Sequence, residues 1–350
     1  MQHLHEVYVD CLIKEISMYQ HVLQEHMIKT VYIGGGTPTC LSDHLLEKLM
    51  LNVMCMMKMD ENVEVSIESN PGTLTQSNLA LLRKNGVNRL SIGLQTLDDE
   101  MLSCLGRIHT AEQFIDNYQI ARREGFNNIN IDLMFSLPGQ TLKNWRDTIE
   151  KIVALNPAHL SCYSLKIEEN TPFYKDYQAK RFEIPDDETD RQMYEVIKQV
   201  LNPKGYKHYE ISNFAKPGFC CHHNRVYWKG NPYIGIGAGS HSFMDNNRYV
   251  NEALPIKYIE KIKARISPII EKRQISKHEK MSDFIILGLR LIEGVNDKEF
   301  YTRFHQSVEE TFPGKVDKYI KMGLMEKKEG YFYLTARGID VSNQIFIDFL

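Results

Sequence analysis

The feature that most constrains the fold is an alternation of short apolar runs with amphipathic segments across the first half of the chain. Five runs are typical of strands, at 30–33, 63–68, 89–95, 128–134 and 159–165. Segments with helical spacing of apolar residues lie between them, at 45–58, 74–85, 111–124 and 142–155. Strands that alternate with helices at this spacing build parallel sheets. We therefore expect an α/β fold with a sheet that is open or curled toward a barrel.

The flanking regions do not show this alternation of strands and helices. Residues 4–26 have the apolar spacing of one long helix, and prolines after residue 166 divide the chain into shorter pieces. These pieces include an extended segment at 206–214 and a glycine-rich stretch at 233–240. The last hundred residues predict helices at 256–264, 280–291, 297–304, 308–322 and 336–349, with a short hairpin near 331–334. Helices followed by a small hairpin resemble a winged-helix unit.

We expect three regions. Residues 1–166 form the barrel core, residues 167–255 complete the barrel and act as a linker, and residues 256–350 form a mainly helical C-terminal domain. A chain of 350 residues is long enough for one large and one smaller domain.

Composition excludes several classes of function. The chain is 43% hydrophobic and 25% charged, and its formal net charge is −3. These values are ordinary for a globular protein, and without a basic stripe nucleic acid is not an expected partner. The sequence has neither a long apolar run nor a secretory leader, so we expect a cytoplasmic protein.

The cysteines form no metal-binding motif. There are seven, and only Cys220 and Cys221 are close together in the sequence. No spacing typical of a zinc or iron–sulfur site is present. We interpret them mostly as core thiols in a reducing compartment.

Polar residues lie at the ends of four predicted strands. The first strand runs into Gly34–Thr37, the second ends in Glu68, the third ends in Gln95, and the fourth carries Asp132. Strand ends of a parallel barrel converge on one mouth, where Arg107 of the following loop would pair with a carboxylate. This set suits a polar, zwitterionic ligand with hydroxyl groups. The alternative is that Glu68 and Asp132 only cap the next helices, which is the better interpretation for any one residue but the worse one for the series.

Several longer motifs resemble one family. They are Gly-Gly-Gly-Thr-Pro-Thr at 34–39, Glu-Ser-Asn-Pro-Gly at 68–72, and the runs at 86–96, 105–109, 130–141 and 223–228. In this order they resemble the radical S-adenosylmethionine (SAM) proteins related to oxygen-independent coproporphyrinogen III oxidase. His-Asn-Arg-Val-Tyr-Trp at 223–228 is similar to the His-Asn-x-x-Tyr-Trp motif of the heme-chaperone branch. The resemblance extends from about residue 7 to the C-terminus.

The resemblance implies a fold and two ligands. The fold would be a partial (β/α)₆ barrel lacking its first strand, followed by the helical, winged-helix-like domain. By position, SAM would be held by Gly35, Gly36, Thr37, Glu68, Gln95, Arg107 and Asp132. Heme would be bound by His223, Asn224, Tyr227 and Trp228, with His223 as the contact to iron.

The sequence departs from the family pattern at one site. The family's first strand is followed by a Cys-x-x-x-Cys-x-x-Cys loop that binds a [4Fe–4S] cluster, and this sequence contains neither. We therefore expect no metal ligands in this chain, although the family implies the cluster. Without the cluster SAM has no electron source for reductive cleavage. The unpaired sheet edge should also lower stability.

Three functions remain open. The leading one is a heme chaperone that binds heme and transfers it to an acceptor protein, with an acceptor at a membrane and a homodimer as further expectations. The alternative is oxygen-independent coproporphyrinogen III oxidase, which is disfavoured by the missing cysteines and by the histidine motif. The third is a decayed or mis-started gene product. No catalytic residue is assigned, and whether the chain is an enzyme stays open.

Overall fold

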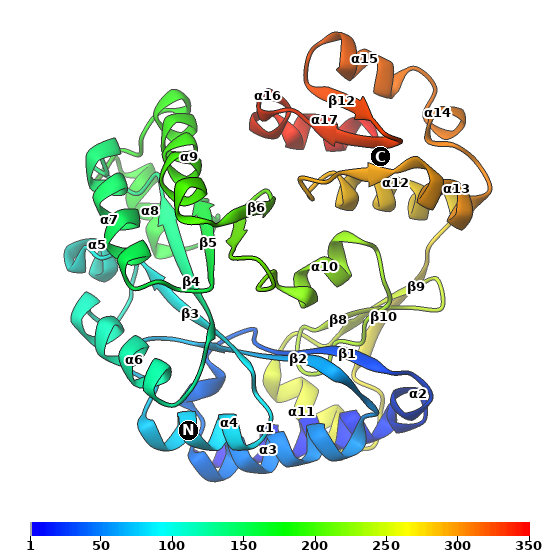
Figure 1. The fold of residues 1–350 in the computed structure, drawn as a ribbon. Helices are drawn as coiled ribbons and strands as arrows, with labels where there is room; N and C mark the ends of the chain where they lie inside the picture. The colour runs from blue at the N-terminus through cyan, green and yellow to red at the C-terminus, as the bar shows by residue number, and fades with distance from the viewer. Residues whose placement is uncertain (1) are drawn as a thin grey trace.

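A curled, seven-stranded sheet organises the molecule. The computed structural model describes residues 2–350, and the strand order of this sheet is β1-β2-β3-β4-β5-β7-β6 (Figure 1). The first five strands are β1 (Ile28–Ile33), β2 (Met59–Ser69), β3 (Arg89–Gln95), β4 (Asn128–Phe135) and β5 (His159–Ser164). They pair in parallel and in sequence order. The expected α/β half-barrel is therefore confirmed.

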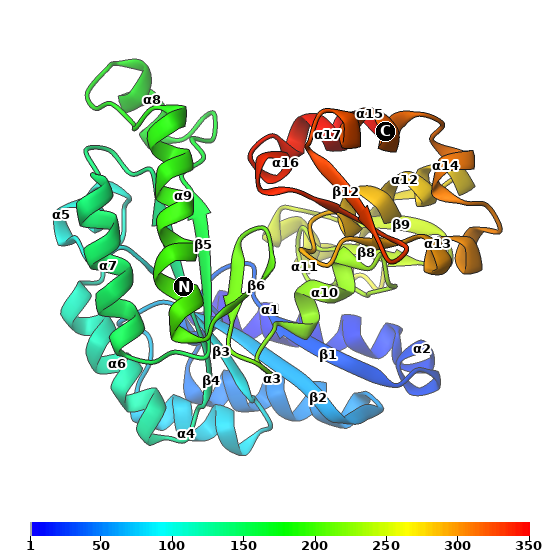
Figure 2. The ribbon, with the colours of Figure 1, turned by 45° about the horizontal axis from the view of Figure 1, so that its top comes forward.

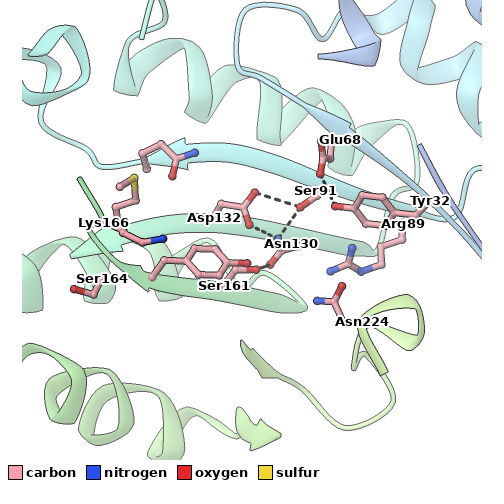
Figure 3. Close-up of a pocket in the computed structure, with 13 residues that line it drawn as sticks. Tyr32, Glu68, Arg89, Ser91, Asn130, Asp132, Ser161, Ser164, Lys166 and Asn224 are labelled. Atoms are coloured by element: carbon pink, nitrogen blue, oxygen red, sulfur yellow. Dashed lines mark hydrogen bonds between the residues drawn. The ribbon is translucent and has the colours of Figure 1, made fainter. Parts of the chain in front are cut away.

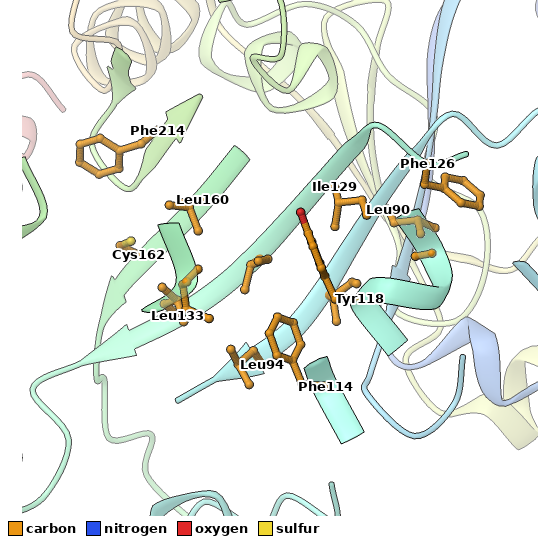
Figure 4. Close-up of a cluster of buried hydrophobic side chains, with 14 of the residues drawn as sticks. Leu90, Leu94, Phe114, Tyr118, Phe126, Ile129, Leu133, Leu160, Cys162 and Phe214 are labelled. Carbon is orange, nitrogen blue, oxygen red and sulfur yellow. The ribbon is translucent and has the colours of Figure 1, made fainter. Parts of the chain in front are cut away.

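Helices cover the outer face of this sheet (Figures 1 and 2). They are α3 (Asp43–Met56), α4 (Gln76–Lys84), α5 (Asp99–Cys104), α6 (Ala111–Arg123), α7 (Leu142–Ala154) and α9 (Asp187–Leu201). Helix α8 (Pro172–Gln178) lies beyond the end of α9 and has no buried residue (Figure 2). Side chains alternate between the two faces of a strand, so Leu90, Ile92 and Leu94 all point to the same side. There they join the main core with Phe114 and Trp145 from the helices, and all five are fully buried (Figure 4).

The boundaries of these helices follow from local chemistry. Thr75, Thr110 and Thr141 accept hydrogen bonds from the backbone N–H three residues later, which caps α4, α6 and α7. Gly86 and Gly125 follow two of the helices with φ of +88° and +87°, a conformation that glycine adopts without strain. Threonine and glycine therefore set the length of the βα units.

Three helices that we expected to be continuous are each divided into two in the structure. The first divides at Tyr19 into α1 (Gln2–Met18) and α2 (Gln20–Glu25), and this break lets Leu23 reach the cluster that contains Val9 and Ile16. Residues 308–322 divide into α14 (Val308–Thr311) and α15 (Lys315–Lys321), because Pro313 lacks an N–H and Gly314 has φ +71°. Residues 336–349 divide into α16 (Ala336–Asp340) and α17 (Ser342–Asp348).

The extended segment at 206–214 is also different from expectation. It forms two strands, β6 (Lys207–Glu210) and β7 (Asn213–Ala215), that pair antiparallel with each other. β7 also pairs antiparallel with β5 and so extends the sheet. The turn between β6 and β7 is held by the Glu210 carboxylate, which accepts from the backbone N–H of Ser212.

A second sheet was not predicted. It contains β8 (His241–Met244), β9 (Asn247–Asn251) and β10 (Ile269–Gln274), all antiparallel. Its strands lie on both sides of residue 255, so the second and third expected regions share one sheet. Two helices flank it, α10 (His222–Trp228) before and α11 (Pro255–Lys263) between β9 and β10.

The glycine-rich stretch is fixed to the first helix by one buried carboxylate. Glu15 of α1 accepts hydrogen bonds from Gly237 N (2.7 Å), Tyr258 Oη (2.6 Å) and Asn251 Nδ2 (2.6 Å). Glu15 has no exposed surface, and burial raises the pKa of its carboxyl group. These bonds hold the 233–240 segment between the barrel and the second sheet.

The C-terminal domain is mainly helical, as expected. It contains α12 (Lys277–Gly288), α13 (Asp297–Phe304), α14 to α17, and a three-stranded antiparallel sheet of β11 (Val295–Asn296), β13 (Tyr331–Leu334) and β12 (Met325–Lys328). Its core contains the buried rings of Phe284, Phe300, Phe304, Phe312 and Phe349. Within residues 2–350, the helices are all too short or too polar to cross a lipid bilayer.

Candidate functional site

A polar cavity of about 420 Å³ opens at the inner face of the half-barrel (Figure 3). Each of the five parallel strands contributes to its wall, and the lining includes Tyr32, Glu68, Arg89, Ser91, Gln95, Asn130, Asp132, Ser161, Tyr163 and Lys166. These positions alternate with the apolar positions that pack under the helices. The period of a strand therefore places one set of side chains in the core and the other in the cavity.

Glu68 is held at the end of β2 by two donors. Tyr32 Oη donates to its Oε1 (2.9 Å), and the backbone N–H of Gly35 donates to its Oε2 (3.0 Å). A Cβ atom at Gly34 would lie 2.6 Å from the Glu68 carboxyl carbon. Glycine is therefore required at position 34, because only a residue without a side chain allows the Glu68 carboxylate to approach this loop.

Asp132 is fixed on β4 in a similar way. Asn130 Nδ2 donates to its Oδ1 (2.8 Å) and Ser91 Oγ donates to its Oδ2 (3.3 Å). Burial raises the pKa of its carboxyl group, while Asn130, Ser161 and Arg89 oppose the shift. The helix that follows β4 is capped by Thr141, and the helix that follows Glu68 is capped by Thr75. The alternative that Glu68 and Asp132 are helix caps is therefore excluded.

Gln95 lies at the end of β3 with φ +75°, which is an unfavourable conformation for a residue with a Cβ atom. It lines the same cavity as Glu68 and Asp132. Backbone strain of this kind is concentrated at functional sites, where the surrounding structure maintains it.

Thr37 and Arg107 meet through Asn70 at the rim. Asn70 Nδ2 donates to Thr37 Oγ1 (2.7 Å), and Arg107 Nη1 donates to Asn70 Oδ1 (3.3 Å). Arg107 forms no ion pair with a carboxylate among residues 2–350, and burial lowers the pKa of its guanidinium group. Gly35 and Gly36 leave open space where a Cβ atom would be. The seven residues expected to bind SAM thus lie at or beside one cavity, and their role stays a prediction.

The helix α10 carries the His-Asn-x-x-Tyr-Trp motif and packs against β1 and β2. Glu64 of β2 accepts hydrogen bonds from the backbone N–H groups of His222 (2.9 Å) and His223 (3.1 Å). A carboxylate at this position satisfies donors that a helix start leaves unpaired. The motif is therefore anchored to the barrel wall.

The ring of His223 is bonded at both nitrogens. Nδ1 lies 2.9 Å from Thr30 Oγ1, Nε2 lies 3.0 Å from Tyr227 Oη, and the ring stacks on Tyr32 with centroids 4.9 Å apart. Burial lowers the pKa of His223 to about 4, so the imidazole is neutral at neutral pH. One of these hydrogen bonds must break before His223 can bind iron.

The other motif residues face two different cavities. Asn224 lines the barrel cavity, whereas Tyr227 and Trp228 line a second cavity of about 360 Å³ on the other side of α10. The second cavity lies between α10, the β8–β9 sheet, α12 and α13. Of the four residues that the sequence grouped as one heme contact, Asn224 thus lines a different cavity from Tyr227 and Trp228, and His223 contacts Tyr227.

The described cysteines do not fit an iron–sulfur cluster. Residues 2–350 contain no group of three or more His, Cys, Asp or Glu side chains arranged to hold a metal ion. Cys11, Cys162 and Cys221 are buried in different parts of the fold, and Cys40 lies exposed beyond the glycine loop. The cysteines of residues 2–350 therefore offer no set of thiolates that could hold a [4Fe–4S] cluster.

Sequence reasoning missed several residues of these sites. Arg89 is 2% exposed and lines the barrel cavity, and Tyr32 and Lys166 also contribute to its wall. Polar residues at alternate positions of β3, from Arg89 through Ser91 to Gln95, were the available signal for that lining. No local signal identified Glu64, because its role depends on a helix about 160 residues later.

Comparisons with known proteins identify two family models and close relatives. Residues 12–152 match the Radical SAM superfamily, and residues 275–341 match the HemN C-terminal domain. The chain is 37% identical over 348 residues to the heme chaperone HemW of Bacillus subtilis, covering 96% of this chain and 92% of that protein. It is 31% identical over 344 residues to the heme chaperone HemW of Escherichia coli, covering 95% of this chain and 87% of that protein.

One solved structure has the same fold throughout. It is the coproporphyrinogen III oxidase HemN from Escherichia coli, described as a radical SAM enzyme. The TM-score is 0.85 at 22% identity, over 100% of this chain and 84% of that one. At this identity the likeness establishes the fold alone.

Proposed function

The chain belongs to the HemW family of radical SAM proteins, and on that premise we propose that it is a heme chaperone, which binds heme and transfers it to an acceptor protein. The observation that carries the proposal is the likeness to HemW proteins over almost the entire chain. Coproporphyrinogen III oxidase is the less supported alternative, since its likeness is one of fold at 22% identity.

The barrel cavity is the proposed SAM site. Its wall combines the carboxylates of Glu68 and Asp132 with the amide of Gln95, and the backbone N–H of Gly36 follows that of Gly35, which donates to Glu68. Carboxylates accept from the ammonium and ribose hydroxyl groups of SAM, and backbone N–H groups donate to its carboxylate. SAM, when bound, would supply a sulfonium group, whose reductive cleavage requires an electron donor. The residues of this chain bind and orient that ligand.

Heme is proposed to bind at α10. This helix has one side against the barrel wall and the other against an aromatic cavity, so a ligand held in that cavity would contact the second sheet and the C-terminal domain. Tyr227 and Trp228 provide flat apolar surface for a porphyrin. We further propose that the chain works in the cytoplasm and delivers heme from this helix to its acceptor.

Titration with hemin tests the function. The Soret band should shift and saturate at one heme per chain, and adding an apo-globin should then transfer the heme to the globin spectrum. Trp228→Ala should weaken binding at least tenfold, because it removes a large apolar wall. Tyr301→Ala, at a residue that is 56% exposed and outside both cavities, is the matched control and should bind like the wild type. Binding that never saturates would reject the chaperone function.

A further inference from the structure

The second cavity has the composition of a site for a flat, apolar anion. Five aromatic rings contribute to its wall, from Tyr227, Trp228, Tyr233, Phe243 and Phe284. Two of them, Tyr227 and Tyr233, meet edge to face with centroids 4.7 Å apart. The volume of about 360 Å³ is within the range of ligand pockets, roughly 300–1,000 Å³. The two cavities have no lining residue in common.

Positive charge is in excess around this aromatic wall. Arg248, Lys280 and Arg303 line the cavity, and Arg248 Nη2 donates to Asp283 Oδ2 (2.6 Å), the one acidic residue among the lining residues. The Arg303 guanidinium group already has partners, because it donates to the carbonyl oxygens of Lys229 (3.0 Å) and Gly230 (2.7 Å) at the end of α10. Lys280 is bonded to Asn246 Oδ1 (2.8 Å), a neutral acceptor, so its charge is available to a carboxylate.

His241 is the available iron ligand in this cavity. It lies on β8 with an exposed side chain, lines the cavity, and its ring forms no hydrogen bond with residues 2–350. His223, by contrast, is bonded at both ring nitrogens and lines neither cavity. Burial raises the pKa of Tyr227 to about 12, so this neighbour adds no negative charge. A free imidazole binds iron without breaking an existing contact.

We propose that the porphyrin binds in the cavity between α10, β8 and α12, with His241 as its axial ligand and with Lys280 facing its carboxylates. Figure 2 shows these elements side by side, where α10 meets the second sheet and the C-terminal domain. This inference rests on the proposed function and specifies its site. His223 then acts as a positioning residue that holds α10 against Thr30 and Tyr32.

The test uses the full chain and two ligands. Ferric heme binding is followed by absorbance and electron paramagnetic resonance, and metal-free protoporphyrin IX binding is followed by fluorescence. His241→Ala should remove the signature of histidine ligation and weaken heme binding at least tenfold. The same variant should bind protoporphyrin IX within twofold of the wild type, because that ligand has no iron. His44→Ala, at an exposed position on α3, is the matched control.

A second variant tests the carboxylate contact. Lys280→Gln should weaken protoporphyrin IX binding about threefold to tenfold and should leave binding of its dimethyl ester unchanged, because the ester has no charge to pair. If His241→Ala keeps the wild-type heme spectrum while His223→Ala loses it, the inference is wrong and the proposed function stands. If ATP displaces protoporphyrin IX from the wild type, the cavity is a nucleotide site and the inference is also wrong. If the wild type binds no heme at saturation, the proposed function itself fails.

Discussion

Glu64 of β2 accepts a hydrogen bond from the backbone N–H of His223, at 3.1 Å, and so connects the barrel wall to the start of α10. The other oxygen of the same carboxylate accepts from His222 N at 2.9 Å. Glu64 is 6% exposed, so water does not replace it readily. Glu64 therefore anchors the start of α10, and the His223 ring adds contacts with Thr30 and Tyr32.

Substitution of Glu64 should destabilise the protein through α10. Glu64→Ala leaves two partly buried N–H groups without acceptors, which costs about 1–3 kcal/mol of unfolding free energy. Glu64→Gln keeps one acceptor oxygen and should cost about half as much. Urea unfolding measures the loss, and hydrogen exchange should be faster at residues 222–228. Glu61→Ala, on an exposed part of the same strand, should change stability by less than about 0.5 kcal/mol. Equal effects of Glu61→Ala and Glu64→Ala would contradict this account.

Gly34→Ala should weaken SAM binding. The new Cβ atom would lie 2.6 Å from the carboxyl carbon of Glu68, whose oxygens are held by Tyr32 and Gly35. The carboxylate must move and lose at least one of these bonds, so we expect a loss of affinity of about tenfold or more, equivalent to ~1.4 kcal/mol. Equilibrium dialysis with labelled SAM measures it. Cys40→Ala, at an exposed position beyond the same loop, is the control and should bind normally.

Gln95→Gly should raise stability while it lowers SAM affinity. Glycine adopts φ +75° without strain, so the unfolding midpoint should increase, with a gain on the order of 1 kcal/mol. The amide that lines the barrel cavity is lost in the same change, so SAM binding should weaken. Thermal unfolding and dialysis of one preparation separate the two effects. A destabilised variant would show that the side-chain contacts of Gln95 exceed the strain of its backbone.

Stability should fall as the pH is lowered from about 6.5 to about 4, partly because of His223. Burial lowers the pKa of His223 to about 4 in the folded state, from an ordinary value of 6.5. Over this range the unfolded chain binds more protons than the folded chain, so the free energy of unfolding rises with pH and is lost on acidification. The contribution of one such histidine is at most on the order of 3 kcal/mol.

His223→Gln isolates that contribution. The variant cannot titrate, so its unfolding free energy should vary less with pH than that of the wild type between pH 4 and 6.5, whatever its absolute stability. Urea denaturation at several pH values gives both curves. His44→Gln, at an exposed position, should keep the wild-type slope. Parallel curves for the wild type and His223→Gln would show that His223 is not held neutral by burial.

The sequence by itself determined the barrel and the polar ends of its strands. Alternation of apolar runs with amphipathic segments specifies a parallel sheet, and the period of two places Gln95 and Asp132 opposite the core residues of the same strands. Threonine caps and glycine stops are local signals, so the βα units were predictable as well. These features depend on neighbours within a few positions of each other.

Only the tertiary structure decided how the α10 motif is divided. Its six residues look like one binding unit in the sequence, yet Asn224 lines the barrel cavity, Trp228 lines the aromatic cavity, and His223 is bonded between them. The contacts responsible come from Thr30 and Glu64 on one side and from the second sheet on the other. Contacts between residues so far apart in the sequence leave no periodic pattern in it. They arise from packing of separate elements rather than from local backbone preference.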